Sequence, residues 1–266
     1  MNSLPETSES TTKPRSELVA GKRLVALIFL APLIILLVTL LGLEAMTLLA
    51  EQQIEQQRRA IAIAGGKSET ERHSPLWIQK IMGPDFHSFF DRTRLVSIVM
   101  TGENIVDAKL QKVSQVPDLV SLDLQNSHIT NEGLKTISKL ESLKYLNLRG
   151  TEVTSLKPLA SLPQLDTLLI NFSQVRGPGL EDLSQFPKLQ FLGAGGLKID
   201  DRAVEILAKC RGLEELSING AVLGESGLKP LHALKDLKML SLKDATVDPA
   251  DLSAFKQALP GCKIGQ

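Results

Sequence analysis

Apolar residues recur at a fixed period through most of the chain. In the stretch LKYLNLRGTEV, residues 143–153, apolar side chains stand at positions 1, 4, 6 and 11. Seven units with this pattern start at Leu95, Leu119, Leu143, Leu165, Leu189, Leu213 and Leu237. Successive starts are 24, 24, 22, 24, 24 and 24 residues apart. A period of this length predicts a solenoid in which stacked units share one core.

Each unit has a strand half and a helix half. Positions 4 to 6 alternate as in a short strand, with leucines pointing inward and the residues between them pointing outward. In the second half, as in residues 130–140, apolar residues recur every three or four positions, and Thr130 can cap a helix. Asp248 before Pro249 predicts another capped helix. The shorter third unit predicts a less regular turn over residues 154–162. We therefore expect an α/β solenoid, with a parallel sheet on its concave side and short helices on its convex side.

A second pattern stands apart from the repeats. Residues 24–43 contain no charged side chain, and about 20 residues of helix span the hydrocarbon core of a bilayer. We predict a transmembrane helix over residues 23–43. Lys and Arg are enriched before it, which places the N-terminus in the cytoplasm and the repeat domain outside, in a single-pass protein of the cell membrane.

Two other interpretations of this run were weighed. A cleaved signal peptide normally has an apolar region of about 7–15 residues, shorter than this run, but the small residues Ala45 and Ala50 keep that alternative open. A buried core helix would show a polar face, and residues 24–43 have none.

The remaining segments were assigned by composition. Residues 1–22 are predicted to be a disordered cytoplasmic leader, residues 44–64 a helical stalk, and residues 65–74 a flexible linker. Residues 75–94 contain Trp77 and three phenylalanines, and we expect them to form an N-terminal cap on the solenoid. Residues 95–266 form the seven-unit domain, with LSAFKQALPGCKI closing its far end.

Residues 95–266 resemble a leucine-rich repeat domain. The whole layout resembles bacterial single-span, membrane-anchored leucine-rich repeat proteins. The matching features are the Ser/Thr-rich leader, the apolar run, WIQKIMGPDFHSFF, the I-T-N-E-G-L sequence of a unit, and the terminal ALPGCKI. The resemblance implies the fold more than any particular role.

Composition excludes several classes of function. The formal net charge is zero, whereas nucleic-acid binders need a basic excess, so no nucleic acid is expected. The two cysteines, Cys210 and Cys262, are separated by two units and are predicted to be free thiols, mostly buried.

No catalytic, metal-binding or cofactor-binding residues can be proposed. The four histidines are scattered and have no metal-ligand spacing. Residues 191–200 lack the Lys-Ser/Thr pair of a phosphate loop. Asp200 and Asp201 are interpreted as a helix cap rather than a calcium site. We expect no enzyme and no cofactor.

Candidate binding residues lie at the outward positions 3, 5, 7 and 8 of the units. Tyr and Arg are frequent anchors of interfaces, and the glycines Gly193, Gly195 and Gly196 are expected to leave a notch beside Phe191. The predicted partner-binding residues are Asp123, Tyr145, Asn147, Arg149, Asn171, Phe172, Phe191 and Asn219.

The function predicted from these observations is a membrane-anchored, non-catalytic module that binds a protein or peptide outside the cytoplasm. The alternative is a structural protein that organises the envelope through glycan contacts or self-association along the stalk. The stalk does not sustain apolar residues at heptad spacing, which disfavours this alternative.

Overall fold

The computed structural model describes residues 15–73 and 92–266. They divide into two compact parts at the boundary between Gln52 and Gln53. Helix α1 (Arg15–Ile63) runs through that boundary as one continuous helix. It begins within the predicted leader and ends within the predicted stalk, and residues 1–14 of the leader lie outside the described residues.

In the N-terminal compact part, which ends at Gln52, the described side chains of α1 include apolar groups on every side of the helix. From Leu33 to Val38 each side chain is at least half exposed, from 53% at Ile34 to 70% at Leu33. In the predicted span, the side chains of residues 23–32 lie outside the described part. Among the described residues, no helix is both long and apolar enough to cross a membrane.

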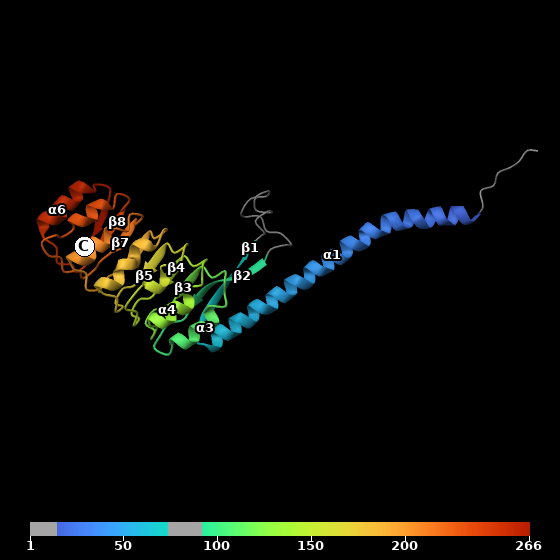
Figure 1. Cartoon of the computed structure of the whole chain (residues 1–266), viewed down its shortest axis with the longest axis horizontal. Coiled ribbons are helices and arrows are strands. Elements are labelled where there is room, and N and C mark those ends of the chain that lie inside the picture. Colours follow the sequence, from blue (N-terminus) through green and yellow to red (C-terminus); the bar gives the residue numbers. More distant parts are fainter. Residues whose placement is uncertain (1–14, 74–91) are drawn as a thin grey trace, which may run out of the picture. The chain divides into compact units, whose positions relative to one another are not determined.

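The C-terminal compact part, which starts at Gln53, is built on one sheet of nine strands, in chain order from β1 to β9. Strands β2 to β9 run parallel, and Figure 1 shows them stacked side by side, with helical segments along the opposite side. The strands are β1 (Lys67–His73), β2 (Arg92–Val99), β3 (Ser121–Asp123), β4 (Tyr145–Asn147), β5 (Thr167–Leu169), β6 (Phe191–Gly193), β7 (Glu215–Ser217), β8 (Met239–Ser241) and β9 (Lys263–Gly265).

Short helices return the chain from each strand to the next. They are η1 (Asp107–Lys109), α3 (Leu110–Val113), α4 (Asn131–Ile137), η2 (Lys157–Leu159), η3 (Gly177–Gln185), α5 (Asp201–Leu207), η4 (Lys229–Ala233) and α6 (Pro249–Ala258). The predicted caps are confirmed: the side chains of Thr130, Asp200 and Asp248 each accept a hydrogen bond from a backbone N–H of the following turn. The short third unit returns through the 3₁₀ helix η2, as its irregular sequence predicts.

The core consists of the inward rows that the repeat pattern predicts. Positions 1, 4 and 6 are buried in all seven units, and Leu146, Leu148 and Val153 of the third unit have no exposed surface. Each fully buried aliphatic side chain contributes about 1.5–3 kcal/mol relative to an exposed one. Because every unit adds the same layer, the predicted solenoid with a parallel sheet and short helices is confirmed.

The loop after each strand is held without an asparagine ladder. At position 9, the Ser127 hydroxyl donates to the Leu124 carbonyl at 2.6 Å, and the Thr151 hydroxyl donates to the Leu148 carbonyl at 2.7 Å. Both side chains are buried. Each hydroxyl therefore binds a carbonyl of its own unit, and these bonds do not connect one unit to the next.

The N-terminal end of the sheet differs from the sequence prediction. Residues 65–74 were expected to be a linker, but β1 pairs with β2 in antiparallel register from Lys67↔Val99 to His73↔Arg92. Ser68 and Thr70 are half-buried, while Lys67, Glu69 and Glu71 are exposed. Alternation of charged with small polar residues suits an edge strand, because charges on an exposed edge oppose pairing with another chain.

The last turns of α1 also belong to the repeat domain. Ile61 is 1% exposed and joins the core of the first unit. The Gln57 amide donates to the Gln115 carbonyl at 3.1 Å. Residues 75–91 of the predicted N-terminal cap, including Trp77, lie outside the described residues. Within the described part, this end is therefore covered by the end of α1 and by β1.

The C-terminal end adds a strand that the sequence analysis treated only as a closing segment. Strand β9 continues the parallel register, with Leu240 aligned to Ile264. Phe255 of α6 is fully buried. Both cysteines are free, as predicted: Cys210 is buried and Cys262 is half-buried. Burial raises the pKa of the Cys210 thiol to about 12.

Candidate functional site

The predicted binding residues occupy outward rows along the sheet. Strand register aligns Tyr145, Thr167 and Phe191 in the row of position 3, so a threonine separates the two aromatic side chains. Arg149 and Phe172 lie at positions 7 and 8, beyond the ends of the strands. Positions 7 and 8 follow the end of the strand, whereas position 3 is the first residue of each strand from β3 to β8, so the structure divides the predicted cluster into two groups. We call the edge formed by positions 7 and 8 the exit edge.

Several of the predicted polar residues bind backbone rather than facing solvent freely. Asn147 is only 3% exposed, and its side-chain oxygen accepts a hydrogen bond from the Arg149 N–H at 3.0 Å. Asp123 accepts from the Gln125 N–H at 2.9 Å. These two side chains shape the loop after the strand, and their main contacts are already made.

Asn171 and Asn219 tie one unit to the next. The Asn219 oxygen accepts from the Lys243 N–H at 3.0 Å and from the Ser241 hydroxyl at 2.8 Å. With its amide in the hydrogen-bonding orientation, Asn171 donates to the Gly193 carbonyl at 3.2 Å and accepts from the Gly195 N–H at 3.1 Å. Both residues therefore hold the sheet together.

The notch expected at Gly193, Gly195 and Gly196 is not present. A Cβ atom at Gly193 would lie 2.6 Å from one end of the Asn171 amide, and one at Gly195 would lie 3.0 Å from the other end. A Cβ at Gly196 would collide with the ring of Phe172. These glycines leave no hollow, because side chains of the preceding unit already fill the space above them.

The exit edge has one backbone feature in common to all seven units. Position 8 has a positive φ in every unit, and such a conformation favours glycine, asparagine or aspartate. The residues are Gly102 (99°), Asn126 (54°), Gly150 (65°), Phe172 (56°), Gly196 (73°), Gly220 (75°) and Asp244 (55°). Phe172 is the exception, since a bulky residue in this region is a genuine outlier.

Phe172 is also exposed and paired with a cation. Its side chain is 59% exposed, and the guanidinium carbon of Arg149 lies 5.2 Å from its ring centroid. This distance is typical of a cation–π contact, which contributes about 0.5–1 kcal/mol at an exposed site. The ring lies against the backbone of Gly196, the glycine at the same position of the next unit. The Arg149–Phe172 pair is the most distinctive group on the exit edge.

Tyr145 belongs to the other part of the predicted cluster. Burial, and then the nearby carboxylate of Asp123, raise the pKa of its hydroxyl above the ordinary value. Both effects disfavour the phenolate, so the hydroxyl stays protonated and can donate a hydrogen bond. Tyr145 and Asp123 therefore form a polar, half-buried patch at the middle of the sheet.

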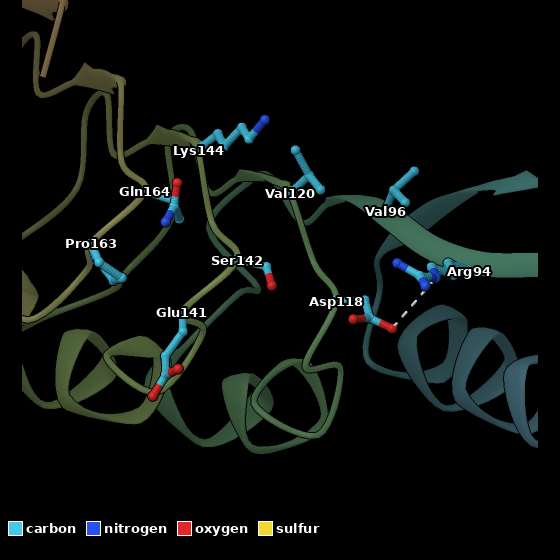
Figure 2. Close-up of a pocket in the computed structure, with 9 residues that line it drawn as sticks. All are labelled: Arg94, Val96, Asp118, Val120, Glu141, Ser142, Lys144, Pro163 and Gln164. Carbon is cyan, nitrogen blue, oxygen red and sulfur yellow. Dashed lines mark ion pairs between the residues drawn. The ribbon is translucent and has the colours of Figure 1, made fainter. Parts of the chain in front are cut away.

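A groove at the opposite edge was missed by the sequence analysis. It lies where the chain enters the strands, at positions 0 and 2 of the units, and has a volume of about 440 Å³ (Figure 2). Its lining residues are Arg94, Val96, Asp118, Val120, Glu141, Ser142, Lys144, Pro163 and Gln164. The residues predicted to bind a partner all lie at positions 3, 5, 7 and 8 instead. The signal available in the sequence was the proline that precedes the strand in two successive units, Pro163 and Pro187.

The groove continues into the next units, but many of its polar groups bind each other. A neighbouring hollow of about 380 Å³ shares Lys144 and Gln164 with the first. Figure 2 shows Arg94 reaching toward Asp118, with Nε and Oδ2 4.0 Å apart, and Lys188 donates to the Gln164 side chain at 2.5 Å. Paired groups of mixed charge give this groove little preference for a ligand of either sign.

Metal-ligating residues do not gather in the described part of the chain. Within residues 15–73 and 92–266, no group of three or more His, Cys, Asp or Glu side chains could hold a metal ion. His128 faces Glu152, with Nδ1 and Oε1 2.5 Å apart, and both side chains of this pair are exposed. The sites that remain are surfaces rather than pockets lined by reactive groups.

Comparisons with known proteins agree with the repeat pattern. A family model described as "Leucine Rich repeat" matches residues 117–138, which cover most of the second unit. No curated protein matches the chain.

Three solved structures resemble this chain at 21% sequence identity each. A leucine-rich repeat protein of Leptospira interrogans has a TM-score of 0.46, over 59% of this chain and 45% of its own. Internalin C2 of Listeria monocytogenes has a TM-score of 0.47, over 70% of this chain and 90% of its own. Internalin F of the same species has a TM-score of 0.48, over 73% and 57%. This chain thus spans about half of the first and the third of these structures.

The repeat pattern extends well beyond the segment that the family model matches. Seven units repeat their inward rows, each contributes one parallel strand, and the family model falls on one of them. Residues 95–266 therefore repeat seven times the pattern that the leucine-rich repeat model matches at residues 117–138.

Proposed function

We propose that this protein is a non-catalytic binding module that holds a protein or peptide on the exit edge of its repeat sheet. Leucine-rich repeat domains generally bind proteins on the extended surface of the solenoid. The observation that carries the proposal is Phe172, whose aromatic ring is 59% exposed on a backbone turn with a φ of 56°. Strained residues of this kind cluster at binding and catalytic sites.

The strain matters because the fold does not require it. Six of the seven units place glycine, asparagine or aspartate at this position, so the turn forms readily without a phenylalanine. An exposed phenylalanine contributes little burial to offset its backbone cost, which is about 1–2 kcal/mol for a non-glycine residue. A ligand that covers the ring gives a physical reason for its presence.

The experiment is a comparison of matched baits made from the full-length protein in mild detergent. In the variant Phe172→Asn the fourth unit receives the residue that the second unit already carries, so its turn should form at least as well. Val222→Ser, which removes another exposed apolar side chain (68% exposed), is the control. Each bait is cross-linked to its neighbours in native membranes before it is purified. The amount of partner protein recovered should be equal for wild type and V222S, and about tenfold lower for F172N.

A F172N bait that retains the same proteins as wild type would refute the role of this edge. The melting temperatures of both variants must first be shown to equal or exceed that of wild type. Because the substitution relieves strain, a loss of binding in F172N would not be explained by unfolding.

We also propose that α1 anchors the domain in the cell membrane and that the repeats act outside the cytoplasm. The uncharged run at residues 24–43 and the exposed apolar side chains from Leu33 to Val38 support this proposal. The Lys and Arg residues that precede the run support the orientation. A cleaved signal peptide would also place the domain outside, but would release it.

The anchor is tested with membrane-impermeant maleimide on intact cells. Both native cysteines are replaced by alanine, and single cysteines are introduced at Glu6→Cys or at the exposed Lys256→Cys. Labelling at residue 256 only, with the protein in the membrane fraction at full length, fits the proposal. Labelling at residue 6 only would indicate the opposite orientation, and a shortened soluble protein would indicate cleavage.

A further inference from the structure

We infer that the Arg149–Phe172 pair recognises an acidic segment of a partner protein, with a carboxylate against Arg149 and a neighbouring apolar side chain against Phe172. This inference rests on the proposed function and specifies the chemistry of the partner. It is carried by the contacts of Arg149, by the charges along the exit edge, and by the exposed ring beside the guanidinium.

Arg149 differs from most other arginines whose side chains the structure describes. Five of them contact a carboxylate or carbonyl oxygen of this chain: Arg58, Arg59, Arg94, Arg202 and Arg211. The Arg149 guanidinium instead lies over the ring of Phe172 and has no hydrogen bond or ion pair with a described residue. Its charge is therefore not neutralised by the part of the chain that the structure describes.

Contact with the ring fixes the guanidinium and leaves its donors available. A guanidinium has five N–H donors directed outward in its own plane, whereas the ring interacts with its cationic charge. The backbone of Arg149 is also held, because its N–H donates to the buried side chain of Asn147 at 3.0 Å. A carboxylate can therefore bind the fork in the bidentate manner without a large loss of side-chain freedom.

The charges of the exit edge near Arg149 favour an anion. Across the seven units, position 7 carries two cations and no acid: Thr101, Gln125, Arg149, Asn171, Gly195, Asn219 and Lys243. The one acid at position 8, Asp244, belongs to the last unit, four units from Arg149. Asp123, two residues before this row, already accepts a hydrogen bond from the Gln125 N–H. An acidic ligand thus meets attraction at Arg149 and no repulsion in the same row.

The exposed ring distinguishes a protein segment from a simple anion. Phe172 remains 59% exposed with Arg149 in contact, so a large part of its surface is free to be covered. An anionic polysaccharide or an inorganic anion would form an ion pair with Arg149 but would leave most of the Phe172 ring exposed to solvent. A peptide that carries Asp or Glu next to a large apolar residue satisfies both, and burial of the ring adds to its affinity.

The test uses a library of random twelve-residue peptides displayed on phage and panned on the full-length protein in detergent. We expect enriched peptides to carry Asp or Glu beside an aromatic or large aliphatic residue. The dissociation constant of one such peptide is then measured by fluorescence polarisation, together with its acid-to-amide analogue. The variants are Arg149→Gln, Arg149→Lys and Phe172→Asn, with the exposed Arg176→Gln as the matched control.

The expected result is a double-mutant cycle with strong coupling. The acid-to-amide change and R149Q should each weaken binding by about tenfold, and the second change should add little once the first is made. R149K should retain part of the affinity, because it keeps the charge but loses the planar fork. R176Q should stay within about twofold of wild type.

Three outcomes would overturn the inference. Enriched peptides that depend on Phe172 but not on Arg149 would leave the binding function in place and remove the acidic anchor. Binding of heparin that is lost in R149Q, with no peptide enriched, would identify an anionic polysaccharide as the ligand. Failure of any peptide or heparin to bind would refute both the inference and the peptide-binding function.

Discussion

The turns that follow the strands of the second and the fourth units have the same backbone but different chemistry. Asn126 and Phe172 both occupy position 8 with nearly equal φ values, 54° and 56°. Each side chain lies over the glycine at the same position in the next unit, Gly150 and Gly196 respectively. Asparagine is a common choice for this conformation, because its short polar side chain bonds locally, and phenylalanine is not.

The difference separates what the fold needs from what it merely permits. The left-handed turn is needed in every unit, since it occurs in all seven. The ring of Phe172 is not needed by the fold, and the glycine of the following unit permits it. A residue that the backbone disfavours and the core does not use is a better indicator of function than an exposed side chain alone.

The largest expected effect follows from filling the space beneath the ring. Gly196→Ala places a Cβ into Phe172 and puts alanine at a φ of 73°, and should lower the free energy of unfolding by about 2–4 kcal/mol. Gly220→Ala is the control, because it has a similar φ of 75° but open space around the added atom. It should cost only about 1 kcal/mol. The measurement is urea denaturation of both variants, and equal costs would show that Phe172 moves aside freely.

An intermediate effect is expected at Asn171, next to the ring. Asn171→Ala removes two hydrogen bonds to the backbone of the next unit and should cost about 1–2 kcal/mol. Lys198→Ala, at an exposed position of the following loop, should change the stability by less than about 0.5 kcal/mol. Thermal denaturation by circular dichroism compares the two. If N171A were as stable as K198A, Asn171 would be free to serve as a contact residue instead.

The smallest expected effect is a gain. Phe172→Asn converts the fourth turn into a copy of the second, and should raise the free energy of unfolding by about 0.5–1 kcal/mol as strain is relieved. Asn126→Gly is the matched change in the second turn and should be nearly neutral. Urea midpoints measured side by side decide the point. A loss of stability in F172N would mean that packing of the ring on Gly196 outweighs the strain.

The repeat pattern predicted the parts of the fold that depend on the core. Inward rows such as Leu143, Leu146 and Leu148 follow from periodicity, because burial of apolar side chains selects the same positions in every unit. The helix caps at Thr130 and Asp248 follow from local hydrogen bonding, which sequence also specifies. These features need no knowledge of neighbouring units.

Features that depend on a neighbour were predicted poorly. Gly193 and Gly195 were interpreted as a notch, because a glycine lacks a side chain, yet the space above them belongs to Asn171 of the preceding unit. Asn147 was interpreted as a contact residue from strand alternation, but the loop that follows folds over it. Residues 65–74 were interpreted as a linker from their composition, but residues 67–73 form strand β1, and strand formation depends strongly on the available partner.

The contacts of Asn126 with Gly150 and of Phe172 with Gly196 limit how position 8 can vary. If a side chain at position 8 requires glycine at position 8 of the next unit, two neighbouring units cannot both carry one. The order Gly102, Asn126, Gly150, Phe172, Gly196, Gly220 and Asp244 obeys this rule. The row of position 8 then behaves as a one-dimensional lattice with nearest-neighbour exclusion, and the side chains in this row are spaced at least two strands, about 10 Å, apart. A ligand that contacts two side chains of position 8 must match that spacing.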